Sequence, residues 1–234
     1  MIKQTDKLEF VKLAEEEINE MEIWRITQTS DPLYEKALHL YSISFPSYEQ
    51  RESLSQEQVL QQDAYHFDVI CDSGELIGEI LYWDIGGAFY IEHFCVLSAM
   101  RNKHYGQKIL NAYQPTPLIL EIDPPVDELS IRRKGFYERC GFVANPYYHI
   151  HPAYHRGNAG HELVIMSSPE MLKPDEYERF NHYLQDTVMK NVYWKIPICQ
   201  TDKERTSIHL SVYCAICDFA QYQSLPCVKG GGTA

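Results

Sequence analysis

Residues 88–122 contain an apolar strand, a helix and a second apolar strand in direct succession. AFYIEHFCV (88–96) is followed by an amphipathic stretch from about 104 to 113, and PLILEI (117–122) has the composition of a buried strand. Two strands joined by a helix run parallel. The preceding segments YHFDVIC and ELIGEILYWDI are joined by Asp72, Ser73 and Gly74, which predicts an antiparallel hairpin. We therefore expect a mostly antiparallel sheet with one parallel pair, an α+β or mixed α/β architecture.

The rest of the chain predicts further helices and strands around this unit. Apolar residues at helical spacing predict a helix over 5–20, and MEIWRIT predicts a strand. Asp31 is the expected N-cap of a helix in DPLYEKALHLYSIS, and SLSQEQVLQQ predicts another. ELSIRRKGFYERCG predicts a helix that ends at Gly141. NPYYHIHP and HELVIMS predict two strands, and a last helix is predicted over 173–192. The expected domains are an N-terminal helical extension (1–20), a main domain (21–193) and a C-terminal tail (194–234).

The chain is acidic, with a net charge of −12 and a pI near 5.3. This charge argues against nonspecific nucleic-acid binding and suits a cationic or amine substrate. No run of about 18 apolar residues occurs and the N-terminus is polar, so we expect a soluble cytoplasmic protein without a membrane span. Cys71, Cys95 and Cys140 lie in apolar surroundings and are expected to be reduced core residues.

A short basic turn separates the strand over 88–96 from the following helix. Arg101, Lys103 and Lys108 lie in or beside it with no acid among them. The first amides of a helix have no intrahelical acceptor, and together with the helix dipole they bind anions. Gly106 would let a bulky anion approach the backbone, so the turn is interpreted as a phosphate site. The alternative is that Gly106 serves helix packing and the basic residues are merely solvated.

The sequence resembles the GNAT superfamily of acyl-CoA-dependent N-acyltransferases. The family's phosphate-binding signature is Q/R-x-x-G-x-G/A after a central strand, and RNKHYG places Arg101 first and Gly106 last. His104 stands where the first glycine is usual. A second signature, Y-x-x-x-G-F at the end of an aromatic helix, is matched by FYERCGF, which contains Tyr137. The resemblance covers about residues 21–193.

The resemblance implies that IEHFCV splays apart from PLILEI and that the pantetheine arm of acetyl-CoA lies in the gap. Unpaired backbone groups would bond the pantetheine amides, and the basic turn would hold the pyrophosphate. A second basic cluster, Arg132 to Lys134, is interpreted either as a further phosphate contact or as a solvated helix face. The implied cofactor-binding residues are Phe94, Cys95, Val96, Arg101, Asn102, Lys103, His104, Tyr105, Gly106 and Gln107.

Acyl transfer to an amine requires that the amine lose a proton and that the departing thiolate gain one. Tyr137 matches the family's general acid, and a phenol with a pKa near ~10 suits a thiolate; a core tyrosine is the alternative. Glu92 is the candidate base, because regular alternation places it on the same face as Phe94 and burial would raise its pKa. His93, expected on the opposite face, is an alternative, as is the absence of a dedicated side-chain base.

The histidine-rich segment YYHIHPAYHRGNAGH invites interpretation as a metal site, because His149 and His151 share a strand face. No carboxylate or cysteine is placed as a further ligand, so we expect no metal and an aromatic hairpin instead. In the family this strand pair walls the acceptor site, so Tyr147, His151 and Tyr154 are expected to shape it. Glu49, in the loop FPSYEQRES, is expected to attract the amine.

The cysteine pair in CAIC (214–217) matches no zinc or redox pattern and is interpreted as incidental. The expected activity is acetyl-CoA-dependent transfer of an acetyl group to a primary amine of a small molecule or peptide. Transfer is expected to be direct, because Cys95 and Cys140 have no paired base. One alternative is a non-catalytic acyl-CoA-binding or sensing module on the same fold. A further alternative is a metal-dependent regulatory protein that uses the histidine hairpin or the cysteine tail. A monomer or homodimer is expected.

Overall fold

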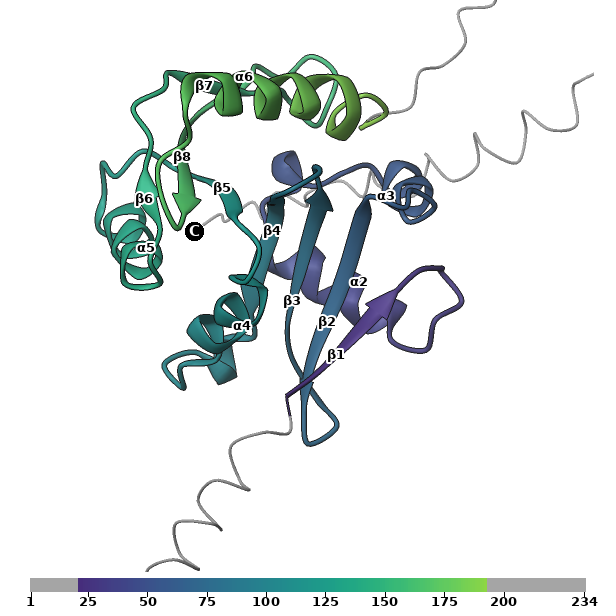
Figure 1. Cartoon of the computed structure of the whole chain (residues 1–234). Coiled ribbons are helices and arrows are strands. Elements are labelled where there is room, and N and C mark those ends of the chain that lie inside the picture. Colours follow the sequence, from purple (N-terminus) through teal and green to yellow (C-terminus); the bar gives the residue numbers. More distant parts are fainter. Residues whose placement is uncertain (1–20, 193–234) are drawn as a thin grey trace, which may run out of the picture. The chain divides into compact units, whose positions relative to one another are not determined.

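The computed structural model describes residues 21–192, and within them the strands form one eight-stranded sheet. Its order is β1-β2-β3-β4-β5-β8-β6, and β7 pairs with β8 (Figure 1). Neighbouring strands are antiparallel except β4 and β5, which are parallel, as predicted. The strands are β1 Met21–Ile26, β2 Tyr65–Asp72, β3 Glu75–Asp84, β4 Phe89–Val96, β5 Leu118–Ile122, β6 Val143–Ala144, β7 His149–His151 and β8 His161–Ser168.

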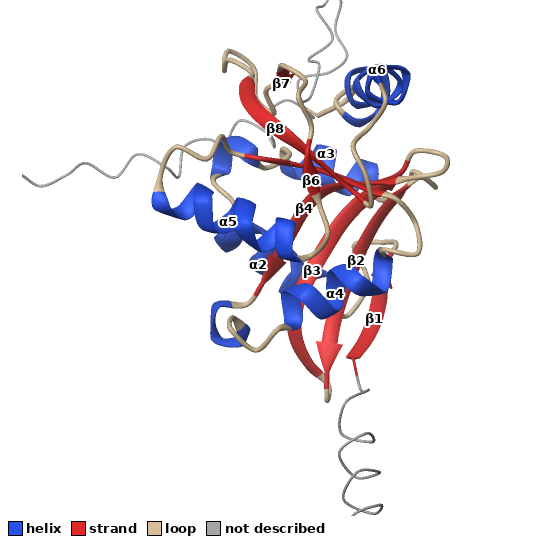
Figure 2. Ribbon diagram, turned by 60° about the vertical axis from the view of Figure 1, so that its left-hand side comes forward, coloured by secondary structure: helices blue, strands red, loops and turns tan. Residues whose placement is uncertain are grey.

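Helices cover both faces of the sheet (Figure 2). One core cluster packs β2 and β3 side chains such as Phe67 and Trp83 against residues of α2, α3 and α6. The other packs Ile80 and Leu120 against α4 and α5. The helices are α2 Tyr34–Ser44, α3 Ser53–Val59, α4 Tyr105–Tyr113, α5 Glu128–Arg139 and α6 Pro174–Tyr183, with short turns η1 Ser47–Glu49 and η2 Ser98–Met100 and a π-helical segment η3 Leu184–Val188.

Most predicted elements are present, with differences at their ends. The β2–β3 hairpin turns at Ser73 and Gly74, whose φ angles of 51° and 76° fit a tight two-residue turn. Helix α2 begins at Tyr34, later than predicted, and Asp31 lies in the turn before it, where it accepts hydrogen bonds from the Leu33 amide and the Trp24 indole. The short strand β6 was not predicted. The predicted helix over 5–20 and the tail over 194–234 lie outside the described residues.

One carboxyl group is buried inside the α2 side of the sheet and forms no ion pair with any residue of 21–192. Glu79 of β3 is 0% exposed, and its Oε1 accepts a hydrogen bond from the Cys95 thiol at 3.7 Å. Its Oε2 is buried with no hydrogen-bond partner among the described residues. Burial raises the pKa of Glu79 well above its usual value. The folded state therefore favours the protonated, neutral form.

This burial predicts a pH dependence of stability that Glu79→Gln removes. The unfolded carboxyl ionises near its ordinary pKa of about 4.3, whereas the folded carboxyl holds its proton to higher pH. The contribution of this group to the free energy of unfolding is therefore fully present below the unfolded pKa. It is lost as pH rises toward the folded pKa, by at most about 1.4 kcal/mol per pH unit. Urea unfolding from pH 4 to 8 should show a shallower decline in Glu79→Gln than in wild type.

The matched control is Glu75→Gln, which removes an exposed carboxyl from the same strand. Its pH profile should follow wild type. Slopes are compared rather than absolute stabilities, because the amide introduced in Glu79→Gln adds a cost that does not vary with pH. Equal slopes in Glu79→Gln and wild type would contradict the assignment.

Candidate active site

The parallel strands β4 and β5 pair over only part of their length. Their register is Phe89 with Leu118, Tyr90 with Ile119 and Ile91 with Leu120, and it ends there. Both strands continue, β4 to Val96 and β5 to Ile122, so they diverge beyond the last pair (Figure 1). The edge of β4 over residues 92–96 therefore presents backbone groups that β5 does not bond.

Phe94, Cys95 and Val96 all lie in this diverging part of β4, as predicted. Phe94 and Val96 pack toward the cluster beneath α4 and α5, whereas Cys95 faces Glu79 on the other side. Burial raises the pKa of Cys95, so its thiol stays protonated. A protonated, buried thiol supports the expectation that Cys95 is no nucleophile.

The chain leaves β4 through η2 and a turn that leads into α4. Asn102 and His104 both have left-handed backbone conformations, with φ of 63° and 62°, and α4 begins at Tyr105. The predicted residues 101–107 thus surround the N-terminus of a helix, where the first amides have no intrahelical acceptor. This is the geometry that binds anions at helix N-termini.

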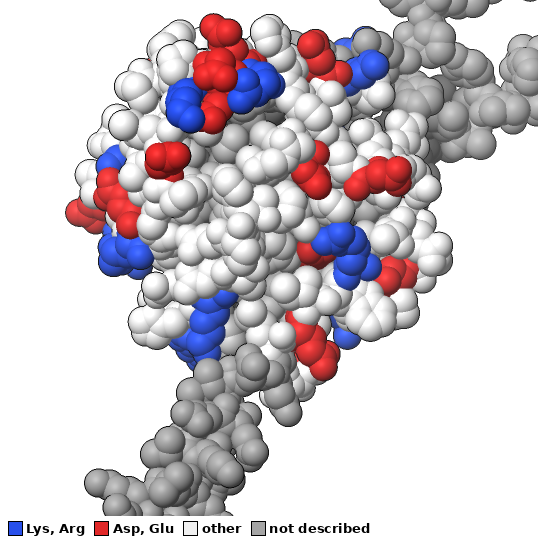
Figure 3. All heavy atoms as spheres, viewed as in Figure 1, with Lys and Arg blue, Asp and Glu red and all other residues white. Residues whose placement is uncertain are grey.

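Basic side chains are exposed around this turn. Arg101, Lys103 and Lys108 are all on the surface, and Figure 3 shows basic side chains over α4. The Arg101 Nε donates to the Val96 carbonyl at 3.4 Å, so the side chain folds back toward the end of β4. The turn therefore places positive charge close to the diverging strands.

Gly106 is tightly packed against α5. A Cβ at this position would lie 3.0 Å from the Phe136 ring and 3.9 Å from the Phe94 ring. A contact at 3.0 Å would force Phe136 to move. The structure thus supports helix packing as a reason for this glycine, alongside its place at an anion-binding turn.

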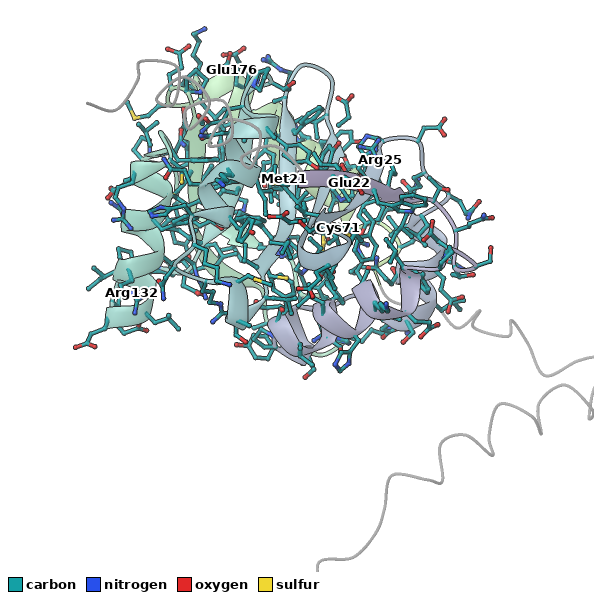
Figure 4. All side chains as sticks on the ribbon, turned by 90° about the horizontal axis from the view of Figure 1, so that it is seen from below. Met21, Glu22, Arg25, Cys71, Arg132 and Glu176 are labelled. Atoms are coloured by element: carbon teal, nitrogen blue, oxygen red, sulfur yellow. The ribbon has the colours of Figure 1, made fainter. Side chains whose placement is uncertain are left out.

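The second basic cluster, on α5, is largely paired. Arg133 forms an ion pair with Asp123 at 2.5 Å, and Lys134 pairs with Glu138. Arg132 is exposed on the outer side of the helix (Figure 4). These pairs favour the interpretation of the cluster as a solvated helix face.

Tyr137 lies on the side of α5 that packs toward the sheet. The helix starts at an Asp127–Ser130 capping box and ends before Gly141, whose φ is 86°, as predicted. The Tyr137 ring lies 5.6 Å from the Phe142 ring and packs against the core beneath α4 and α5. Burial raises the pKa of Tyr137 to about 12. The phenol is therefore protonated at neutral pH.

A bulge interrupts β4 at the candidate base. Leu81 of β3 pairs with His93, but the next residue, Tyr82, pairs with Ile91. Glu92 is therefore the extra residue of a β-bulge, which breaks the regular alternation of side chains.

The bulge puts Glu92 and His93 on the same face of the sheet. Glu92 accepts a hydrogen bond from Trp83, and the His93 ring contacts Tyr41 of α2, both on the face that α2 covers. Phe94 packs on the opposite face. The prediction that Glu92 shares a face with Phe94 and lies opposite His93 is wrong, because it assumed an unbroken strand.

Glu92 is fully engaged in a buried ion pair. Its Oε1 accepts from Arg51 Nη2 at 2.9 Å and from the Tyr154 hydroxyl at 3.0 Å, and its Oε2 accepts from Trp83 Nε1 at 2.7 Å. Burial alone would raise the pKa of Glu92, but Arg51 and then His93 outweigh it, so the pKa is lowered. The expected raised pKa is therefore wrong, because no local pattern indicates that Arg51 lies against this strand.

The residues expected to shape the acceptor site are only partly brought together. Tyr154 and His151 stack with ring centroids 5.0 Å apart, and the Glu49 carbonyl bonds His93 at 3.0 Å. Tyr147 instead stacks on Tyr177 of α6, 4.1 Å away, and donates to the Leu172 carbonyl. Tyr147 is thus a packing residue of the α6 contact.

Comparisons with known proteins agree with this geometry. The sequence profile of the Acetyltransferase (GNAT) domain matches residues 63–144. A GNAT-family protein from Bacteroides thetaiotaomicron is 31% identical over 72% of this chain and 98% of its own, with a TM-score of 0.67. The chain belongs to the GNAT family. It is accordingly an N-acetyltransferase, an enzyme of a family that transfers acyl groups from CoA.

Two more distant solved structures also match the chain. One is a Bacillus subtilis acetyltransferase in complex with CoA, 15% identical over 63% of this chain and 97% of its own, with a TM-score of 0.45. The other is Arabidopsis thaliana Naa50 in complex with a bisubstrate analogue, 14% identical over 64% of this chain and 99% of its own, with a TM-score of 0.46. No curated protein matches the chain. None of the helices within residues 21–192 has the length and apolar character needed to span a bilayer.

A buried carboxylate on β5, Glu121, was not predicted from the sequence to belong to the site. Glu121 lies one residue beyond the last β4–β5 pair, and it accepts hydrogen bonds from the Tyr90 hydroxyl and from His149 Nε2. Burial would raise the pKa of Glu121, but His151 and His149 outweigh it and lower the pKa. The signal was a single acid inside the apolar strand PLILEI, since a buried strand carries a charged residue only where the fold supplies partners for it.

The backbone conformation of His104 is one that favours glycine. The family has glycine at this position, and here the histidine adopts φ 62° and ψ 7°, a left-handed conformation that glycine reaches without strain. We expect His104→Gly to be at least as stable as wild type. His104→Val should lose about 1–2 kcal/mol, because a β-branched residue is strained in this region. Urea unfolding of the three proteins measures both effects.

Lys103→Gly serves as the control, because Lys103 is not among the residues with positive φ. That variant should lose about 0.5–1 kcal/mol through added flexibility of the unfolded chain. If His104→Gly lost as much unfolding free energy as Lys103→Gly, the backbone of His104 would not be strained.

Proposed function

We propose that this enzyme moves an acetyl group from acetyl-CoA to a primary amine of a small molecule or peptide by direct transfer. The observation that carries the proposal is the divergence of β4 from β5, with β4 continuing through the basic turn into α4. An extended amide-containing chain fits the free edge of β4, and a pyrophosphate fits the helix N-terminus. We also propose residues 21–193 as the acyltransferase domain.

The binding roles follow from the positions described above. Backbone groups of residues 94–96 would bond the pantetheine amides, and the turn over 101–107 would hold the phosphates. Arg101 contributes charge at the junction of these two parts, since its guanidinium already reaches the Val96 carbonyl. The acyl group then lies near the bulge at Glu92.

The chemistry needs a proton donor for the departing thiolate, and Tyr137 is proposed for it. Its pKa of about 12 keeps the phenol protonated at neutral pH. A proton passes from it to the thiolate that forms as the carbon–sulfur bond breaks. Glu92 has a positioning role, because its oxygens hold Arg51, Trp83 and Tyr154 in place.

An amine acceptor is consistent with the charges near the site. The whole chain carries −12, which attracts cations over long range. Glu49 lies in η1, its own carbonyl bonds His93, and its carboxylate interacts with Asp123 beyond β5. Burial, and then the charge of Asp123, raise the pKa of Glu49. A bound ammonium group would offset that repulsion.

The first test is calorimetric titration of acetyl-CoA into wild-type protein and Arg101→Ala. We expect binding in the micromolar range, about −8 kcal/mol, and weakening of about tenfold in Arg101→Ala through loss of a charged contact. Arg179→Ala, which removes an exposed arginine from α6, is the control and should bind like wild type.

A screen of primary amines with acetyl-CoA then identifies acceptors by release of free CoA thiol. Absence of acetyl-CoA binding by folded protein would refute the proposal. Binding without acetylation of any amine would also refute it and would point to the sensing alternative.

Tyr137→Phe tests the proton donor. The variant keeps the ring that packs against Phe142 but lacks the hydroxyl, so kcat should fall by about 10²-fold while the Kd for acetyl-CoA stays within about twofold. Tyr183→Phe removes a hydroxyl from α6 and should turn over like wild type. Unchanged kcat in Tyr137→Phe would exclude it as the acid.

A further inference from the structure

A buried layer of polar side chains spans the gap between β4 and β5 on the face that α2 and α3 cover. Tyr154, from the loop after β7, donates to Glu92 of β4 and stacks on His151 of β7. His151 in turn lies 3.8 Å from Glu121 of β5. The layer thus bridges the two strands at the place where they diverge, which is where the proposed function brings amine and thioester together.

Of the two ring nitrogens of His151, only Nδ1 forms a hydrogen bond within residues 21–192. Its Nδ1 lies 2.6 Å from the Pro152 carbonyl, which can only accept, so Nδ1 carries the proton of the neutral ring. Nε2 therefore holds a lone pair. That nitrogen is buried, in a residue that is 4% exposed, and has no hydrogen-bond partner among the described residues. A buried acceptor without a partner is costly and indicates a group that is satisfied when a ligand is present.

Glu121 is placed to stabilise a protonated His151. The distance of 3.8 Å between Glu121 Oε2 and His151 Nε2 is too long for a hydrogen bond but short for an ionic interaction at low dielectric. Oε2 also accepts from Tyr90, and Oε1 from His149, which fixes the carboxylate in position. An imidazolium formed at His151 would thus meet a fixed negative charge.

His93 has a similar arrangement but a less suitable environment. Its Nε2 lies 3.0 Å from the Glu49 carbonyl, and its Nδ1 is buried without a partner among the described residues. Burial lowers the pKa of His93 to about 4. The nearest carboxylate, Glu92, is already neutralised by Arg51. His93 is therefore the weaker of the two bases.

We propose, resting on the proposed function, that His151 accepts the proton of the attacking amine and that Glu121 positions and stabilises it. As the amine nitrogen forms a bond to the thioester carbon, its proton moves to His151 Nε2. The carbon–sulfur bond breaks, and the thiolate takes a proton from Tyr137. The imidazolium and the phenolate then return to their starting states by exchange with solvent, so protons and electrons balance.

The groups that set the ionisation of His151 come from four elements. They are Glu121 of β5, His93 of β4, Tyr154 of the loop after β7 and His161, its register partner on β8, with the Arg51–Glu92 pair beyond Tyr154. Glu121 favours the charged ring, and a charged His93 or His161 would oppose it.

The test is the pH profile of kcat for the best amine from the screen, in wild type and His151→Gln. Wild type should lose activity at acidic pH, with a slope of one proton, as the base becomes protonated. In His151→Gln this acidic limb should disappear, and kcat at neutral pH should fall by about 10²-fold, while the Kd for acetyl-CoA stays within about twofold. Glu121→Gln should move the limb to lower pH, because the imidazolium loses its carboxylate.

Two further variants make the test specific. His182→Gln, on the exposed side of α6, should keep the wild-type profile. His93→Gln should keep the acidic limb. If the limb persisted in His151→Gln, or vanished in His93→Gln instead, the inference would be overturned while acetyl transfer by wild type still supported the proposed function. Failure of wild type to bind acetyl-CoA would overturn both.

A measurement on wild type covers the case in which the variants do not fold. Nitrogen-15 spectra of the histidine rings, assigned through the backbone, should show His151 with its proton on Nδ1. Its titration midpoint should coincide with the acidic limb of kcat. A proton on Nε2, or a midpoint separate from the limb, would contradict the proposal.

Discussion

The buried ion pair between Arg51 and Glu92 is the interaction on which the arrangement around the bulge of β4 depends. The two side chains are 2% and 0% exposed, so each charge relies on the other. Arg51 Nη2 also donates to the Val188 carbonyl in η3, and the guanidinium lies over the Trp83 ring. One residue shortly before α3 thus holds the bulge of β4 and the end of the last helix together. Removal of one partner from such a pair costs about 3–5 kcal/mol.

Where β4 and β5 diverge, polar side chains occupy the space between them. Near the last paired residues, Tyr90 and Glu121 bond one another across the two strands. Farther along, contact between the strands passes through Tyr154 and His151, which come from a different part of the chain. A sheet that opened without these partners would leave carboxylates buried and unpaired, which is strongly unfavourable. The opening and the polar layer are therefore parts of one arrangement.

The sequence predicted the fold well where local patterns decide it. Strand alternation, the Asp72–Gly74 turn and the glycine at 141 all correspond to observed elements. The predicted orientation of Glu92 was wrong, because a β-bulge adds one unpaired residue to the strand and this cannot be recognised in the hydrophobic pattern. The partnership with Arg51 joins residues that are far apart along the chain, and a single sequence contains no signal for it.

The candidate cofactor residues were proposed from a contiguous motif, since a turn and the helix after it are local features. The sequence indicated only some of the residues that the structure brings together between β4 and β5. His151 and Tyr154 were named from the family's hairpin, but their joint position with Glu121 depends on how three strands and a loop meet in space. Distances between side chains of different strands are set by register, which follows from tertiary packing.

The contact between Gly106 and Phe136 has a consequence for how this enzyme can be dissected. Phe136 is the neighbour of Tyr137 on α5, and its ring lies against the glycine at the start of α4. A side chain added at Gly106 would therefore require the Phe136 ring to shift, next to Tyr137 on the same helix. A substitution at Gly106 thus changes the packing between α4 and α5 as well as the space beside the turn, so its effects cannot be assigned to the turn alone.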